Sequence, residues 1–127
     1  MKSILIVDDY LSIRLLVKSL LSELNIPLEV SMASNGKEAL RLISSHRMDL
    51  IITDIFMPEM DGLELLSPFQ NVNNRPKLIA MSDSNTVETN GSTAYLDCAR
   101  EIGADYSISK NNLTISLAPC VKKCLLN

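Results

Sequence analysis

Five polar side chains of this sequence each follow a segment that predicts a strand. They are Asp8, Asp9, Asp54, Ser82 and Lys110. Three carboxylates brought together repel one another, and Mg²⁺, which prefers carboxylate oxygens, waters and a phosphate, relieves that repulsion. A lysine opposite the metal supplies a second positive charge, and the space between suits a transferring phosphoryl group. In such a site Ser82 would donate a hydrogen bond to a phosphoryl oxygen, and Asp54 would be the nucleophile that forms an aspartyl phosphate.

The apolar pattern that must position these residues predicts strands alternating with helices. Strands are predicted at residues 3–7, 28–33, 49–53, 77–82 and 105–109. Helices are predicted at residues 11–24, around 39–43, at 62–69, 94–104 and 111–126, the last beginning with a capping asparagine. Pro119 lies within that last helix and predicts a kink or a late start.

This βα order predicts an α/β fold with a mainly parallel sheet and helices on both faces. The segment at 28–33 alternates apolar and polar residues, so we expect it at an edge of the sheet. Because the carboxyl ends of parallel strands meet at one edge of a sheet, the five polar residues are expected to converge there.

Each of these residues also has a purely structural interpretation. Asp8 and Asp9 could cap the first helix, where its dipole favours negative charge. A lysine after a strand is usually solvated, and a serine at a strand end is commonly a turn residue. The hypothesis of a phosphoryl site therefore depends on the combination and order of the residues, not on any one of them.

Composition limits the possible classes of protein. A chain of 127 residues with 46% hydrophobic and 21% charged residues is typical of one folded globular domain. The net charge is −3 and no basic cluster predicts contact with nucleic acid. The apolar runs are too short for a signal peptide or a membrane span, so we expect a cytoplasmic protein. Cys98, Cys120 and Cys124 do not form a pattern typical of disulfides; buried thiols are expected, with a metal or redox role for the last two as the alternative.

Four stretches of the sequence resemble the receiver domain of two-component response regulators. They are ILIVDDYLSIR, DLIITDIFMPEMDGLELL, LIAMS and GADYSISK. The resemblance extends over essentially the whole chain and implies a single receiver domain at residues 1–127. It also implies a five-stranded flavodoxin-like sheet of strand order 2-1-3-4-5.

The resemblance implies an activity and its partners. Asp54 would accept a phosphoryl group from a histidine kinase or phosphotransfer protein in a Mg²⁺-dependent reaction. Asp9, Asp54 and the backbone carbonyl of Phe56 would bind the Mg²⁺ ion, and Asp8 would assist through water. The chain would catalyse its own phosphorylation and dephosphorylation, and would have no independent small-molecule substrate.

The resemblance further implies a switch. Lys110 matches the family's lysine, and Ser82 matches the hydroxyl that moves toward the phosphate. Tyr106 matches the aromatic residue that follows this movement. The change would alter a surface that binds a downstream protein, whose identity the sequence does not specify.

The sequence departs from the family pattern at three places. Asn111 follows Lys110 where the family usually has a proline, so we expect a trans peptide bond there. Asp83 follows Ser82 where the family favours small residues, and the segment between Ser82 and Lys110 is longer than usual.

Three other protein classes remain as alternatives. The first two departures favour a pseudo-receiver, an interaction module that keeps the fold and is not phosphorylated. A haloacid-dehalogenase-type phosphatase needs a second aspartate two residues after the nucleophile, where this chain has Phe56. A flavin-binding protein fits less well, because Asp8 and Asp9 would repel the flavin phosphate.

Overall fold

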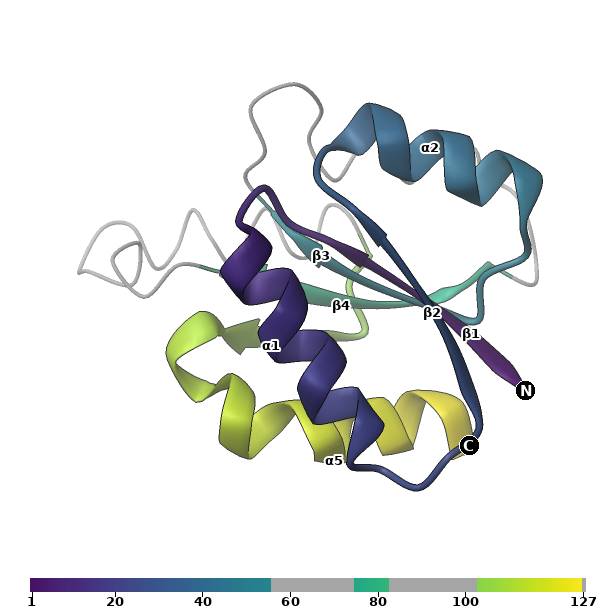
Figure 1. The fold of residues 1–127 in the computed structure, drawn as a ribbon. Coiled ribbons are helices and arrows are strands. Elements are labelled where there is room, and N and C mark those ends of the chain that lie inside the picture. Colours follow the sequence, from purple (N-terminus) through teal and green to yellow (C-terminus); the bar gives the residue numbers. More distant parts are fainter. Residues whose placement is uncertain (56–74, 83–102, 127) are drawn as a thin grey trace.

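The computed structural model describes residues 1–55, 75–82 and 103–126. Within them, five parallel strands form one sheet in the order β2-β1-β3-β4-β5, as predicted (Figure 1). The strands are β1 (Lys2–Val7), β2 (Leu28–Ala33), β3 (Leu50–Asp54), β4 (Lys77–Ser82) and β5 (Tyr106–Ser109). The predicted position of residues 28–33 at an edge is confirmed, because β2 pairs only with β1.

Helices cover both faces of this sheet, which confirms the predicted α/β fold class. They are α1 (Leu11–Ser22), α2 (Gly36–Ser45) and α5 (Leu113–Leu126), the last preceded by the 3-10 turn η3 (Lys110–Asn112). Figure 1 shows α1 and α5 side by side on one face, with α2 on the other. The helix predicted at 62–69 and residues 94–102 of the helix predicted at 94–104 lie outside the described residues, and residues 103 and 104 are not helical.

Two hydrophobic clusters fill the space between the helices and the sheet. Alternate strand residues point to opposite faces, so each strand contributes to both clusters. The cluster under α2 includes Leu5, Val7, Ile51, Leu78 and Ala80. The cluster under α1 and α5 includes Ile4, Ile6, Ile52, Ile79, Met81, Ile108 and Leu117. Burying each large side chain contributes about 1.5–3 kcal/mol, which makes the sheet a firm support for the residues at its edge.

The start of α5 differs from the prediction. The expected capping asparagine is not found at the start of η3, where the side chain of Ser109 accepts a hydrogen bond from the Asn111 N–H at 3.3 Å. The late start is also not found, because α5 begins at Leu113 and continues past Pro119. Pro119 lacks the N–H that would bond the carbonyl of Ile115, and Ile115 is 77% exposed, so water can satisfy that carbonyl.

Candidate active site

Three carboxylates converge at the carboxyl end of the central strands. Asp8 directly follows β1, and Asp54 is the last residue of the neighbouring strand β3. Asp8 is fully buried and Asp54 is 6% exposed, whereas Asp9 is exposed. One oxygen from each of the three lies within 4.8 Å of the others. The predicted meeting of these side chains at one edge of the sheet is therefore observed.

Lys110 joins the two buried carboxylates. Its Nζ atom lies 2.8 Å from Asp8 Oδ2 and 3.1 Å from Asp54 Oδ2. The peptide bond that follows Lys110 is trans, as expected from Asn111, and this does not prevent the contact. Burial alone would lower the pKa of Lys110, but the two carboxylates outweigh it, so that the pKa lies above its ordinary value. The ammonium group is thus charged at neutral pH.

The backbone at the start of α1 holds Asp8 in place. The Tyr10 N–H donates a hydrogen bond to Asp8 Oδ1 at 2.9 Å, and Arg14 Nη1 donates to the Asp8 carbonyl oxygen at 2.7 Å. The N-cap of α1 is Tyr10, which makes no side-chain capping bond. Asp8 therefore supports the helix entry, as the structural interpretation allowed, and also faces Lys110.

Sequence reasoning missed the part that Tyr10 and Arg14 play here. The Tyr10 ring lies next to Lys110, with Nζ 5.5 Å from the ring centroid, which is within the range of a cation–π contact. The available signal was their spacing: residues 10 and 14 are four apart, so they share one face of a helix that begins beside the acidic pair.

Ser82 supplies a buried hydroxyl at the same edge of the sheet. The residue is fully buried, and its Oγ atom has no hydrogen-bond partner within the part of the chain that the structure describes. By contrast, the buried Thr53 hydroxyl donates to the carbonyl oxygen of Asp54 at 3.0 Å. Because leaving a buried hydroxyl unpaired costs free energy, Ser82 Oγ is a suitable donor for an oxygen of a bound group.

The charges of the cluster fit a divalent cation. Three carboxylates and one ammonium group leave a formal charge of −2, which one Mg²⁺ ion would neutralise. Oxygen ligands of this kind are those that Mg²⁺ prefers. Residues 4–118 also match the family model of the response regulator receiver domain.

The chain belongs to the response regulator receiver family. Its relatives include the protein-glutamate methylesterase/protein-glutamine glutaminase 3 of Rhodospirillum rubrum, 43% identical over 117 residues, which are 92% of this chain and 30% of that protein. The corresponding protein of Nocardioides sp. is 38% identical over 103 residues, which are 81% of this chain and 27% of that protein. The receiver domain therefore spans less than a third of the length of these relatives.

Solved structures resemble the receiver domain along nearly its whole length. The response regulator TrrA of Thermotoga maritima, in complex with Mg²⁺-BeF, superposes with a TM-score of 0.76 at 33% identity. The superposition covers 98% of this chain and 100% of that one. This family membership replaces the haloacid-dehalogenase and flavin-binding alternatives.

The arrangement of Ser82 and Tyr106 in the receiver domain differs from the prediction. Leu78, Ala80 and Ser82 are two residues apart in β4, so their side chains lie on the same face of the sheet. Leu78 and Ala80 belong to the cluster under α2, which places Ser82 on that face. Tyr106 packs against the cluster under α1 and α5, on the opposite face. The predicted movement of Tyr106 into space left by Ser82 is therefore not supported, because the sheet separates the two side chains.

Two other residues singled out from the sequence lie outside the described residues. Phe56, whose carbonyl is a predicted metal ligand, and Asp83, the departure beside Ser82, both belong to ranges that the structure does not describe. The proposed contribution of Phe56 to the metal site therefore stays a prediction.

Cys124 in α5 is a buried thiol, as expected, whereas Cys120 is only partly buried and Cys98 lies outside the described residues. Burial raises the pKa of both α5 thiols, to about 11 for Cys124. Across residues 1–55, 75–82 and 103–126, the only group of three residues placed to share a cation is the aspartate cluster, so the alternative metal role of Cys120 and Cys124 finds no third ligand there.

Among the described helices, none has the length and apolar character needed to span a bilayer.

Proposed function

We propose that the chain is one receiver domain over residues 1–127 and that Asp54 accepts a phosphoryl group from a histidine kinase or phosphotransfer protein. The observation that carries this proposal is the contact of Lys110 with both Asp8 and Asp54 beside Asp9. A purely structural ion pair would not need a third carboxylate in the same place, because that carboxylate adds repulsion.

The described side chains divide the reaction among them. A carboxylate oxygen of Asp54 attacks phosphorus, so that a P–O bond forms as the P–N bond of the donor phosphohistidine breaks. Lys110, held charged between the carboxylates, neutralises a phosphoryl oxygen. Ser82 Oγ is buried at the same edge and donates to another oxygen. Positioning and charge neutralisation account for most of the catalysis in such transfers.

Asp8, Asp9 and Asp54 would hold Mg²⁺, together with the carbonyl of Phe56. The bound ion supplies charge neutralisation for the phosphoryl oxygens. Asp9 and Asp54 would offer direct oxygen ligands, and Asp8, which already pairs with Lys110, would act through water. The Mg²⁺-BeF complex of the Thermotoga regulator supports this assignment by similarity.

The partners follow from the same proposal. The phosphorylated domain binds a downstream protein through a surface that differs between the two states, and it contacts neither nucleic acid nor membrane directly. A cytoplasmic location fits a donor kinase whose phosphorylated domain is also cytoplasmic. Hydrolysis of the aspartyl phosphate by the same site returns the domain to its resting state.

Phosphorylation by acetyl phosphate tests the acceptor. With Mg²⁺ present, intact mass should show one added phosphoryl group in the wild type and none in Asp54→Asn. Asp49→Asn is the matched control. Asp49 lies just before β3, at the end opposite Asp54, so the change should not alter phosphorylation. A phosphoryl group retained in Asp54→Asn would place the acceptor elsewhere. Mg²⁺ binding without any labelling of the wild type would favour the pseudo-receiver.

A further inference from the structure

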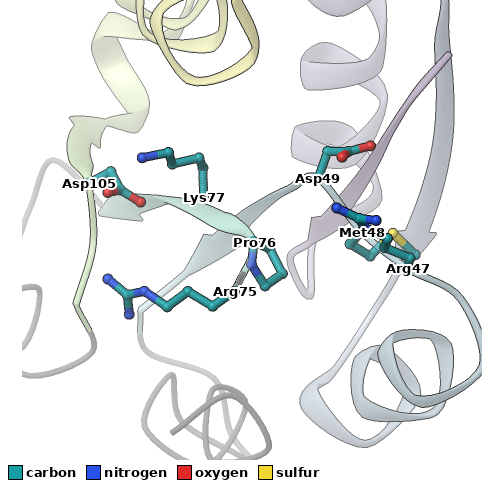
Figure 2. A pocket seen from close by; sticks show the side chains of 7 residues that line it. All are labelled: Arg47, Met48, Asp49, Arg75, Pro76, Lys77 and Asp105. Atoms are coloured by element: carbon teal, nitrogen blue, oxygen red, sulfur yellow. The ribbon is translucent and has the colours of Figure 1, made fainter. Parts of the chain in front are cut away.

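A pocket lies at the amino-terminal edge of the sheet, opposite the candidate active site. Its volume is about 400 Å³, within the range of small-molecule sites. Three segments distant in the sequence line it: Arg47, Met48, Asp49, Arg75, Pro76, Lys77 and Asp105. Figure 2 shows Arg75 and Arg47 on either side of Pro76, with Lys77 and Asp105 near each other.

Three cations of the pocket have no acidic partner within the described part of the chain. Arg47, Arg75 and Lys77 are exposed, and no carboxylate of the described residues lies within ion-pair distance of them. Repulsion between neighbouring cations is unfavourable, and a bound anion would relieve it. The concentration of positive charge is notable in a chain whose net charge is −3.

The two carboxylates of the pocket are engaged by the backbone instead. Asp49 Oδ2 accepts a hydrogen bond from the Ser3 N–H, and Asp105 Oδ2 accepts one from the Leu78 N–H, each at 2.8 Å. A carboxylate that accepts a backbone hydrogen bond is held in place at the strand start. These two groups therefore have a structural task, which leaves the cations available to a ligand.

Arg75 is held in a defined position. Its Nη2 atom donates to the Gly103 carbonyl oxygen at 3.1 Å. Gly103 has a φ of +75°, and a Cβ atom at this position would lie 2.6 Å from Arg75 Nη1. The absence of a side chain at Gly103 thus makes room for the guanidinium, whose other N–H groups make no hydrogen bond to the described residues.

The floor of the pocket is fixed by backbone hydrogen bonds and buried side chains. Met48 and Pro76 are buried, and the Lys77 N–H donates to the Asp49 carbonyl oxygen at 3.0 Å. The Asp49 N–H donates to Ser3 in turn, at 2.8 Å. A rigid floor lowers the entropy cost of binding, because few groups need to be ordered.

We propose that this pocket binds a small phosphate-bearing anion. Guanidinium groups match phosphate oxygens in pairs, and a lysine ammonium adds a point charge. Arg47, Arg75 and Lys77 together suit a ligand with two phosphate groups better than one with a single charge. The proposal does not depend on phosphorylation of Asp54, since the two sites lie at opposite edges of the sheet.

Titration with inorganic pyrophosphate in Mg²⁺-free buffer tests the proposal. Amide shifts should saturate and concentrate at residues 47–49, 75–77 and 103–105. Arg75→Gln and Lys77→Gln should each weaken binding about tenfold, the usual effect of losing a charge-assisted hydrogen bond. Orthophosphate and adenosine monophosphate, used as further probes, distinguish a preference for a diphosphate from one for a phosphate ester.

Matched controls separate this site from general attraction. Arg41→Gln and Lys37→Gln remove exposed cations of α2 outside the pocket and should leave pyrophosphate binding unchanged. Arg47→Gln should not disturb the fold, because the Arg47 side chain is exposed and makes no hydrogen bond to the described residues. Equal losses in controls and pocket variants would overturn the proposal, as would shifts confined to the surroundings of Lys110.

Discussion

Ser82 and Tyr106 belong to neighbouring strands, yet they lie on opposite faces of the sheet. Within β5, Tyr106 shares its face with Ile108, and Lys123 of α5 lies above the ring, with Nζ 6.0 Å from its centroid. Ser82 instead pairs in register with Ser109, on the face under α2. A movement of the Ser82 side chain can therefore reach Tyr106 only through the backbone of the sheet.

The first prediction is that Tyr106 does not respond directly to phosphorylation. On addition of Mg²⁺ and beryllofluoride, NMR shifts should be large for Ser82 and Ser109 and small for the Tyr106 ring. Tyr106→Leu should change phosphorylation by acetyl phosphate less than twofold, whereas Ser82→Ala should weaken beryllofluoride binding about fivefold through one lost hydrogen bond. A large shift of the Tyr106 ring would contradict this.

The second prediction concerns the ion pairs of Lys110. Lys110→Met removes a cation that contacts two buried carboxylates, which should cost roughly 2–3 kcal/mol in the free energy of unfolding. Added Mg²⁺ should restore more stability to this variant than to the wild type, because the ion and the ammonium group compete for the same oxygens. Urea denaturation with and without Mg²⁺ measures both effects. A lower Mg²⁺ affinity in the variant would show that no such competition exists.

The third prediction separates Asp9 from its neighbours. Asp9 is exposed, and Lys110 pairs with Asp8 and Asp54 instead. Asp9→Asn should therefore keep or slightly raise the thermal midpoint of the metal-free protein, since it removes repulsion. The same change should weaken Mg²⁺ binding at least tenfold, measured by titration calorimetry. Unchanged Mg²⁺ affinity would remove Asp9 from the proposed ligands.

A fourth prediction tests the contact between Tyr10 and Lys110. Tyr10→Phe keeps the aromatic face and should leave phosphorylation by acetyl phosphate unchanged. Tyr10→Leu removes the cation–π contact and should slow the reaction about two- to fivefold, because Lys110 is held less firmly. Equal phosphorylation rates in Tyr10→Phe and Tyr10→Leu would show that the cation–π contact does not help to position Lys110.

The fifth prediction is a loss of stability at high pH. The folded-state pKa of Cys124 is about 11, above its ordinary value of 9.0, because the buried thiol resists ionisation. The contribution of the protonated Cys124 thiol to the free energy of unfolding is thus fully present below pH 9 and is lost as the pH rises through 11. Lys110, whose pKa is also raised, acts in the same direction. The midpoint of urea denaturation should fall between pH 9 and 11, and it should fall less steeply in Cys124→Ala than in the wild type. An equal fall in both proteins would show that Cys124 does not cause the loss of stability.

Local patterns in the sequence determined the order of the described strands and helices and the meeting of the aspartates and Lys110 at one edge of the sheet. Apolar periodicity marks the described helices and the edge strand β2, and continuous apolar runs mark β1 and β3, which are buried on both faces. Parallel strands place their carboxyl ends together, so Asp8, Asp54 and Lys110 had to meet once the strand order was known. The helix start beyond Lys110 was less predictable, since Ser109 and not an asparagine caps η3.

The tertiary structure alone decided which residues face each other across strands. Tyr106 and Ser82 were predicted to act together, but the pairing of Ile79 with Tyr106 sets the register and thereby the face on which each lies. The basic pocket likewise joins Arg47 and Arg75, which no local pattern connects. Such relationships depend on the pairing of distant segments, whereas periodicity within one segment reports only which of its own residues share a side.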